Sequence, residues 1–214
     1  MKYTLLLLLV SSALLSTSCR STTYAVKEKF GIEKRDILVD DVEEARDSQQ
    51  EAKEQFTSAL KQFQSVVEVE GGDLEEKYTE LKKEYEDSER RAERVRTRID
   101  EVERVSRDLF KEWEQEITTF QSDNLRRSSE DQLQQTRRKF ETMLASMRNV
   151  EEKMEPVLLA FRDQVLYLKH NLNSRAIASI QTEAEGITRQ IEDLIVDMND
   201  SIDEANQFIA SMER

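Results

Sequence analysis

The stretch that decides the fold runs from Leu74 to Phe120 and reads LEEKYTELKKEYEDSERRAERVRTRIDEVERVSRDLFKEWEQEITTF. Apolar or small residues recur in it at alternating intervals of four and three, which places them on one stripe of a helix. The phase is nearly unbroken for about 47 residues, or about 70 Å of helix. A lone helix with so narrow an apolar stripe is not stable in water, so the stripe predicts partner helices.

Three further segments repeat this spacing. One precedes the stretch, from Val42 to Val66, and two follow it, from Leu133 to Leu168 and from Ile177 to Met212. The segments predict four helices of roughly 35, 48, 43 and 39 residues in chain order. Because their stripes must face one another, the sequence predicts an all-α fold. The fold is either an elongated four-helix bundle or two packed antiparallel coiled-coil hairpins, and the spacing alone does not separate them.

Turn signals separate the outer pairs of helices. Gly71-Gly72 stands where a helix C-cap belongs, and Asp73 with Glu76 forms a capping box for the next helix. Residues 171–174, Asn-Leu-Asn-Ser, predict a second tight turn, because Asn tolerates left-handed backbone. Each short connection predicts an antiparallel pair of helices.

The turn between the two middle helices is less sharply marked. Ser122 with the two residues after it is one candidate break. Ser128-Ser129, followed by two acidic residues, is a second N-cap signal. The sequence therefore places this turn within residues 122–129.

Several residues interrupt the apolar pattern. Three polar residues occupy core-type positions: Gln49, Ser88 and Ser106. They indicate either buried polar groups that fix the register of the helices or helix interfaces that are partly open to water. Pro156 lies within the third helix and is expected to kink it, because it removes one backbone hydrogen bond and clashes one turn back. Gly186 marks a second place where a helix can break.

The composition limits the function. The chain has 214 residues and is 36% charged and only 37% hydrophobic, with four Gly and one Pro. This disfavours a large compact α/β enzyme core, and the turn residues are too few for a sandwich, barrel or doubly wound sheet. The net charge of −13 repels the anionic phosphate backbone of nucleic acids at long range, so we expect no nucleic-acid partner.

The residues suited to chemistry are few. The single His, His170, has Tyr167 three positions before it, so the Glu-x-x-His pair of helix-bundle di-iron sites is missing. Met143, Met147 and Met154 share a helical face that could bind Cu(I), but they lie on the heptad stripe, and core filling is the better interpretation. We therefore predict a protein that is not an enzyme and holds neither a metal nor a cofactor.

Short basic islands stand out in this acidic chain. They are Arg90-Arg91, Arg126-Arg127 and Arg137-Arg138-Lys139. We expect them to pair with acidic neighbours three or four positions away. The alternative is that the islands near 122–139 cluster at one end of the bundle and meet lipid or an anionic polymer.

The N-terminus predicts a secretory signal, because residues 1–18 combine a positive start with an apolar run too short for a comfortable membrane span. Residues 15–19, Leu-Ser-Thr-Ser-Cys, resemble a bacterial lipobox, although Ser16 stands where Leu is usual. The sequence therefore predicts lipidation of Cys19, and the alternative is a plain signal peptide followed by a free Cys. In such lipoproteins Arg20, rather than Asp, after the Cys implies the outer membrane.

The chain thus divides into three predicted parts. Residues 1–18 form a lipoprotein signal peptide, residues 19–34 a lipidated N-terminus and tether, and residues 35–214 a helical coiled-coil domain.

Four stretches carry a family resemblance. They are residues 31–39 (GIEKRDILV), 125–130 (LRRSSE), 155–166 (EPVLLAFRDQVL) and 168–178 (LKHNLNSRAIA). They resemble an uncharacterised proteobacterial lipoprotein family, a domain of unknown function similar to DUF2959, over nearly the whole mature chain. The resemblance implies an envelope location and a helical architecture, and it supplies no chemistry and no site residues.

These observations predict a non-enzymatic lipoprotein of a bacterial cell envelope, held by its lipid anchor at the periplasmic face of the outer membrane. It would act as a helical scaffold or interaction module for unknown envelope proteins, with a homo-oligomer as one arrangement. The alternative is a membrane-remodelling or envelope-stress helical protein that contacts lipid.

Overall fold

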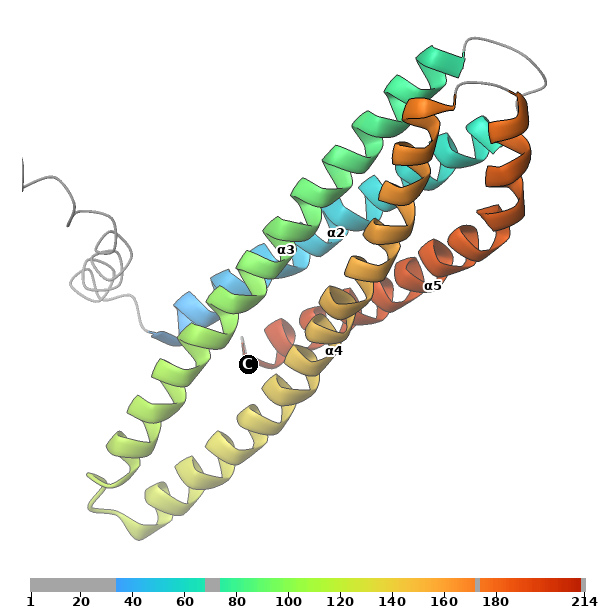
Figure 1. Cartoon of the computed structure of the whole chain (residues 1–214). Coiled ribbons are helices and arrows are strands. Elements are labelled where there is room, and N and C mark those ends of the chain that lie inside the picture. The colour runs from blue at the N-terminus through green and yellow to red at the C-terminus, as the bar shows by residue number, and fades with distance from the viewer. Residues whose placement is uncertain (1–33, 68–73, 172–173, 213–214) are drawn as a thin grey trace, which may run out of the picture.

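The structure is a computed structural model that describes residues 34–67, 74–171 and 174–212. The regular structure of these residues is helical (Figure 1), in the order α2 (Lys34–Val67), α3 (Leu74–Ile117), α4 (Asp123–His170) and α5 (Ser174–Met212). The signal peptide, Cys19, the Gly71-Gly72 turn and the Asp73 cap all lie outside the described residues.

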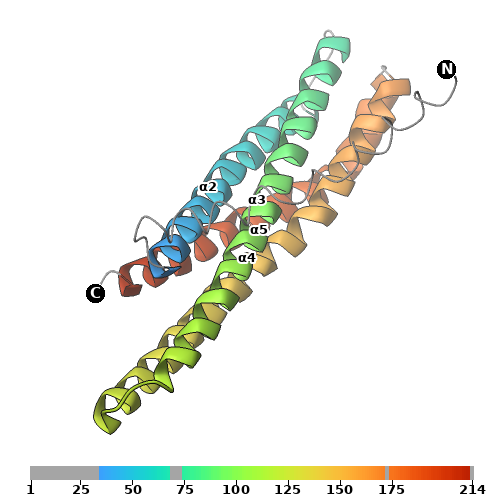
Figure 2. The same cartoon turned by 90° about the vertical axis from the view of Figure 1, so that its left-hand side faces the viewer.

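The four helices form one bundle. Each helix runs antiparallel to the next in sequence, α2 packs against both α3 and α5, and α4 packs against the same two helices (Figures 1 and 2). The predicted all-α fold is therefore confirmed. Of the two predicted arrangements, the elongated four-helix bundle is the correct one, because α2 and α5 close the ring between the two hairpins.

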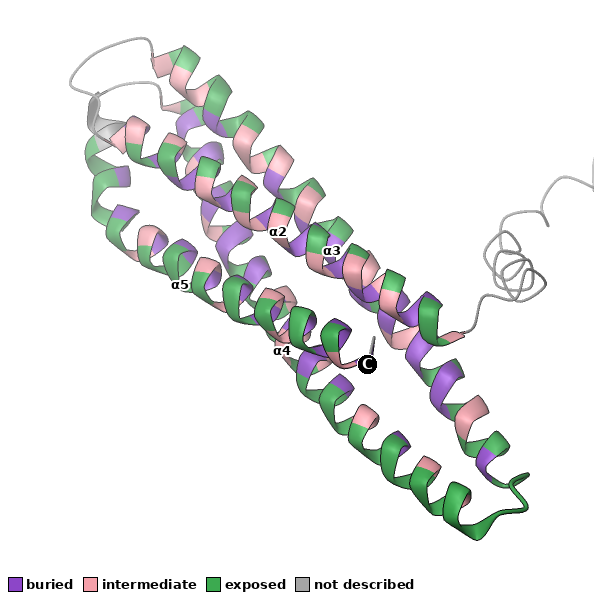
Figure 3. Cartoon of the chain, turned by 180° about the vertical axis from the view of Figure 1, so that it is seen from behind, coloured by how far each residue is buried: buried purple, intermediate pink, exposed green. Residues whose placement is uncertain are grey.

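The predicted apolar stripes are the core. Every in-phase position of α2 from Val42 to Val66 is buried, and Figure 3 shows the buried residues facing inward along all four helices. Met143, Met147 and Met154 are completely buried in the core, as the core-filling interpretation predicts. Edge-to-face aromatic pairs link the helices, with Phe63 on Phe161 at 6.0 Å between ring centroids.

The middle turn begins earlier than predicted. Helix α3 ends at Ile117, and α4 begins after Ser122, whose hydroxyl oxygen accepts a hydrogen bond from the Leu125 N–H at 3.4 Å. The first predicted break is therefore correct. The second, at Ser128-Ser129, is wrong, because both residues lie inside α4 and the Ser129 hydroxyl serves a contact between helices.

The predicted polar interruptions of the core have different roles. Ser88 and Ser106 are buried, and each hydroxyl donates to a carbonyl of its own helix, at 2.7 and 2.9 Å. Gln49 is fully buried, and its Oε1 accepts a hydrogen bond from the Ser201 hydroxyl of α5 at 3.0 Å. Gln49 is thus the one of these three side chains that links two helices.

The two predicted break points leave their helices continuous. Helix α4 runs unbroken through Pro156, and α5 runs unbroken through Gly186. Helix α5 changes direction in its N-terminal part (Figure 1). Gly186 lies within the N-terminal third of α5. The Gly186 backbone has open space where a Cβ would stand.

The bundle is stepped at one end. Lys34, the first residue of α2, pairs with Glu112 of α3 at 3.0 Å, and Met212, the last residue of α5, lies near the same level. Helices α3 and α4 continue beyond the first residue of α2 and the last residue of α5 (Figure 2). We call residues 111–139 the projecting hairpin; on its α4 side, from Lys139 back to Asp123, it is about 24 Å long.

Candidate interaction surface at the projecting hairpin

A groove lies at the step, where all four helices meet. Its volume is about 480 Å³, and its lining combines Arg35 of α2, Trp113 of α3, Lys139 of α4 and Met212 of α5. The rest of the lining is Leu109, Glu112, Glu116, Gln132, Gln135, Thr136 and Ser211. The groove thus combines apolar side chains with charged and amide groups, a composition common in binding sites. Sequence analysis missed it, because it arises only where α2 and α5 stop.

Trp113 joins the two helices of the projecting hairpin. It is half-buried, and its indole Nε1 donates a hydrogen bond to the Ser129 hydroxyl of α4 at 2.8 Å. A satisfied indole N–H fixes the plane of the ring, so Trp113 presents a fixed apolar surface to the groove. The only sequence signal was the position of this Trp on the heptad stripe.

Arg137 fastens the two helices one turn away. Its guanidinium lies over the Phe110 ring, 5.1 Å from the centroid, and donates to Glu114 at 2.7 Å. Phe110 in turn contacts Phe140 edge-to-face at 5.5 Å between centroids. These contacts hold α3 against α4 at the step, where Phe140 also contacts Phe208 of α5 at 5.7 Å between centroids.

A second hollow of about 410 Å³ lies beside the groove, between α4 and α5. Its lining includes Lys139, Thr142 and Phe208. Lys139 lines both hollows, so its ammonium group stands on the ridge between them.

The basic islands only partly follow the predicted local pairing. Arg90 pairs with Asp87 and Arg126 with Asp123, each three positions away, as predicted. Two other island residues pair across helices instead: Arg91 with Glu51 of α2, and Arg137 with Glu114 of α3. The charged ends of the side chains of Arg127, Arg138 and Lys139 have no ionic or hydrogen-bonding partner among residues 34–67, 74–171 and 174–212.

The turn of the hairpin exposes apolar side chains. Phe120 is 39% exposed and Leu125 is 59% exposed. Phe120 was predicted as the last core position of its helix, and this prediction is wrong, because α3 ends before it and no α2 residue reaches that level. Figure 3 shows that exposed residues dominate this end of the molecule.

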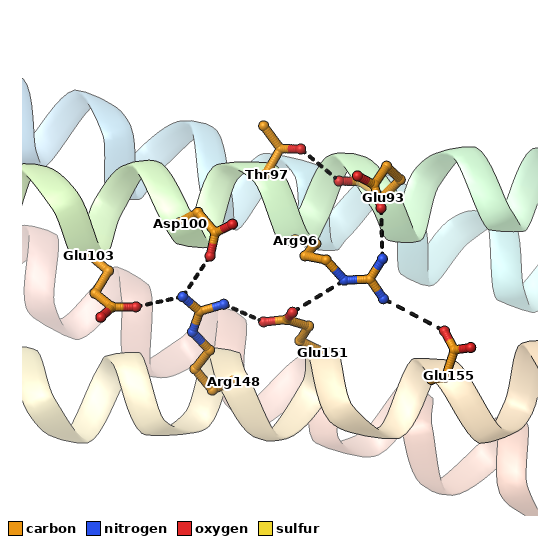
Figure 4. A network of polar contacts seen from close by, with 8 residues as sticks. All are labelled: Glu93, Arg96, Thr97, Asp100, Glu103, Arg148, Glu151 and Glu155. Atoms are coloured by element: carbon orange, nitrogen blue, oxygen red, sulfur yellow. Dashed lines mark hydrogen bonds and ion pairs between the residues drawn. The ribbon is translucent and has the colours of Figure 1, made fainter.

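An ion-pair network fastens α3 to α4 above the projecting hairpin (Figure 4). Arg148 of α4 reaches Asp100 at 2.7 Å, Glu103 at 2.5 Å and Glu151 at 2.6 Å. Partial burial lowers the pKa of Arg148, but its hydrogen bonds to the three carboxylates outweigh that effect and leave the pKa raised. Arg148 therefore remains a permanent cation.

Arg96 extends the same network along α3. It contacts Glu93 at 2.7 Å, Glu151 at 3.3 Å and Glu155 at 3.6 Å. The hydrogen bond to Glu93 is the main reason that the pKa of Arg96 is raised. Glu151 thus accepts hydrogen bonds from both arginines. A connected network, rather than a set of isolated ion pairs, joins α3 to α4.

Comparison with known proteins places the chain in one family. The family model described as a protein of unknown function (DUF2959) matches residues 23–212. The chain belongs to this family. No curated protein and no solved structure matches it.

In this DUF2959 chain, the described residues hold no group of three or more His, Cys, Asp or Glu side chains placed to bind one metal ion. His170 is exposed in the last turn of α4, and the hydroxyl of Tyr167 donates to Ser179 at 3.3 Å. Within the described ranges, no helix is both long and apolar enough to cross a bilayer.

Proposed function

We propose that this protein is a lipid-anchored helical rod of a bacterial cell envelope, which acts as a scaffold or interaction module and performs no chemistry of its own. The observation that carries the proposal is the stepped rod itself. A four-helix body places a projecting hairpin and a groove at the end where the described chain begins. An elongated bundle with a filled core offers side faces and an end to other molecules.

The position of Lys34 supports anchoring near the step. Fourteen residues separate Cys19 from Lys34, and fully extended they reach at most about 50 Å. An acylated Cys19 would therefore hold the step and the projecting hairpin close to the membrane. With two or more acyl chains, such an anchor is stable. The lipobox and Arg20 favour the periplasmic face of the outer membrane as the location.

The groove is the surface that we expect a partner to use. It combines Trp113 and Met212 with the side chains of Arg35 and Lys139. Neither cation has an ionic or hydrogen-bonding partner within the part of the chain that the structure describes. An aromatic anchor beside uncommitted charges is typical of protein interaction sites.

The Cys19→Ser variant tests the anchor. We expect it to leave the membrane fraction, because the rest of the mature body is polar and acidic. A variant that still sediments with membranes after a high-salt wash would disprove the lipid anchor.

Photo-crosslinking in the native envelope tests the interaction surface. A photoreactive residue at Thr136, in the groove, should give a discrete crosslinked product. The matched control is Lys61, an exposed residue of α2 away from the step, which should give none. Equal or absent products at both positions would contradict the use of the groove.

A second candidate function is contact with lipid by a membrane-remodelling protein, which the exposed Phe120 and Leu125 favour. Vesicle tubulation by the purified protein would support it, whereas recovery of specific protein partners from solubilised envelopes would favour the scaffold.

A further inference from the structure

We propose that the partner of the projecting hairpin is a second copy of the same chain, packed antiparallel and tip to tip about a two-fold axis. In this dimer each hairpin supplies the two helices that the other lacks. The inference rests on the proposed function only for bringing the copies together on one membrane. The surface itself is argued from the step, the groove and the charges.

The first argument is the missing half of the bundle. Above the step, α3 and α4 are covered by α2 and α5, and below it they are not. On α3 this face passes from buried Leu109 through half-buried Trp113 to exposed Glu116, spaced by four and three residues, as the cover of the other helices ends. Two antiparallel helices of a second hairpin would restore the four-helix cross-section.

The second argument is that the two ends of the hairpin complement each other. The tip presents Phe120 and Leu125, whose exposed fractions are 39% and 59%. The step presents the groove, whose lining includes the apolar side chains of Leu109 and Trp113. In an antiparallel pair, the tip of each copy meets the groove of the other. A two-fold interface requires self-complementarity of this kind.

The third argument is charge. The projecting hairpin carries six basic and six acidic side chains and is neutral, whereas the whole chain has a net charge of −13. Tip-to-tip packing joins the neutral hairpins and keeps the acidic bodies at opposite ends, where screening by salt is greatest. Within the described residues, the ammonium group of Lys139 and the carboxylate of Glu116 in the groove both lack a partner, so the surface offers uncommitted charges of both signs. Such a surface suits another copy of itself better than an anionic bilayer.

The contact area predicts a weak dimer. Two helices side by side over about 24 Å cover on the order of 500 Å² per copy, at the lower limit for specific interfaces. We therefore expect micromolar dissociation in solution. Anchors on one membrane raise the effective concentration, because in each copy the described residues begin with Lys34 at the step, beside the interface.

The geometry predicts which residues lie on the two-fold axis. Leu125 and Gln132 share one face of α4, seven residues apart, and Lys139 follows after another seven. If Leu125 of one copy meets Lys139 of the other, the axis passes beside Gln132. A Gln132→Cys substitution should therefore place two thiols close together across the axis.

Crosslinking of the full-length protein in its native envelope tests the proposal. We expect Gln132→Cys to form a dimer with a short bismaleimide. The matched control is Gln64→Cys, an exposed glutamine on α2 away from the step, which should stay monomeric. Dimers in the control would instead report a free Cys19, and so would reveal failure of the anchor separately from failure of the interface.

A second pair of substitutions tests the contact itself. Added to the Gln132→Cys protein, Leu125→Lys should lower the dimer yield about tenfold, because it brings a second cation against Lys139 of the other copy. Val196→Lys, on α5 at a similar 57% exposure, should leave the yield unchanged. Sedimentation of the full chain in mild detergent should give a higher dissociation constant for the Leu125 variant than for the Val196 variant.

Three results would overturn the proposal. One is a monomer at all concentrations with no Gln132→Cys dimer. Another is equal loss of dimer with Leu125→Lys and Val196→Lys. The third is quenching of a fluorophore at position 125 by brominated phospholipid, which would assign the tip to the bilayer.

Discussion

The buried pair of Gln49 and Ser201 makes the sharpest stability prediction. Both side chains are fully buried, and the Ser201 hydroxyl donates to Gln49 Oε1 at 3.0 Å. Among the described residues, the buried side-chain atom without a hydrogen-bond partner is Gln49 Nε2. The amide therefore combines one satisfied acceptor with unsatisfied donors in the apolar seam between α2 and α5.

The expected effect of Gln49→Met is stabilising. An unpaired buried polar group costs about 1–3 kcal/mol, and the hydrogen bond that is lost contributes about 0.5–1.5 kcal/mol. Met has nearly the volume of Gln, so the core need not repack. The freed Ser201 hydroxyl can donate to a carbonyl of its own helix, as Ser48 does to Ala45 at 2.7 Å. We expect the free energy of unfolding to rise by about 1 kcal/mol.

Urea unfolding followed by circular dichroism measures this change. The thermal midpoint should rise by about 2–4 °C for a chain of this size. Ser201→Ala should act in the opposite direction and lower the free energy of unfolding by about 1–2 kcal/mol, because it leaves Gln49 without any partner. Ser88→Ala is the matched control, since that hydroxyl bonds only within α3, and its effect should stay within about 0.5 kcal/mol.

One result would refute this reasoning. A loss of more than about 1 kcal/mol in Gln49→Met would mean that the amide nitrogen contributes a net favourable contact in the folded protein.

Three further predictions concern the network, the bend and the shape. Arg148→Met should lower the free energy of unfolding by about 1–2 kcal/mol at low salt and by less in 1 M NaCl. Arg90→Met, which breaks one exposed ion pair, should lower it by about 0.5 kcal/mol or less. Equal urea midpoints for the two variants would contradict the network. Gly186→Ala should raise the thermal stability by about 0.5–1 kcal/mol, because a methyl group has open space there, and a lower thermal midpoint would mean that α5 needs glycine to bend. The monomeric protein without residues 1–20 should have a radius of gyration of roughly 20–24 Å by solution scattering, and a value near 16 Å would contradict the rod.

The sequence predicted the helices and their core faces, because both depend on local periodicity. The 4-3 spacing marked Phe56, Met147 and Leu194 as core positions, and all three are buried. Ser122 could be recognised as an N-cap, since a cap depends on its own helix alone. The periodicity failed at Phe120, because burial there needs a neighbouring helix that does not extend so far.

The candidate surface could not be predicted in this way. A stripe shows which face of a helix is buried, but it does not show which helix covers it or where that cover ends. The groove exists because α2 begins and α5 ends at the same level of α3, which is a matter of register between distant segments.

The sequence by itself thus determined an all-α chain of long heptad helices and a filled apolar core, and lipidation of Cys19 stays a prediction from it. Only the tertiary structure decided that the helices close into one bundle, that Arg91 and Arg137 pair across helices, and that α3 and α4 project alone. The physical reason is the separation along the chain over which each interaction acts. Helix periodicity and capping act within a few residues, whereas ion pairs, register and uncovered faces depend on side chains that lie far apart in the chain.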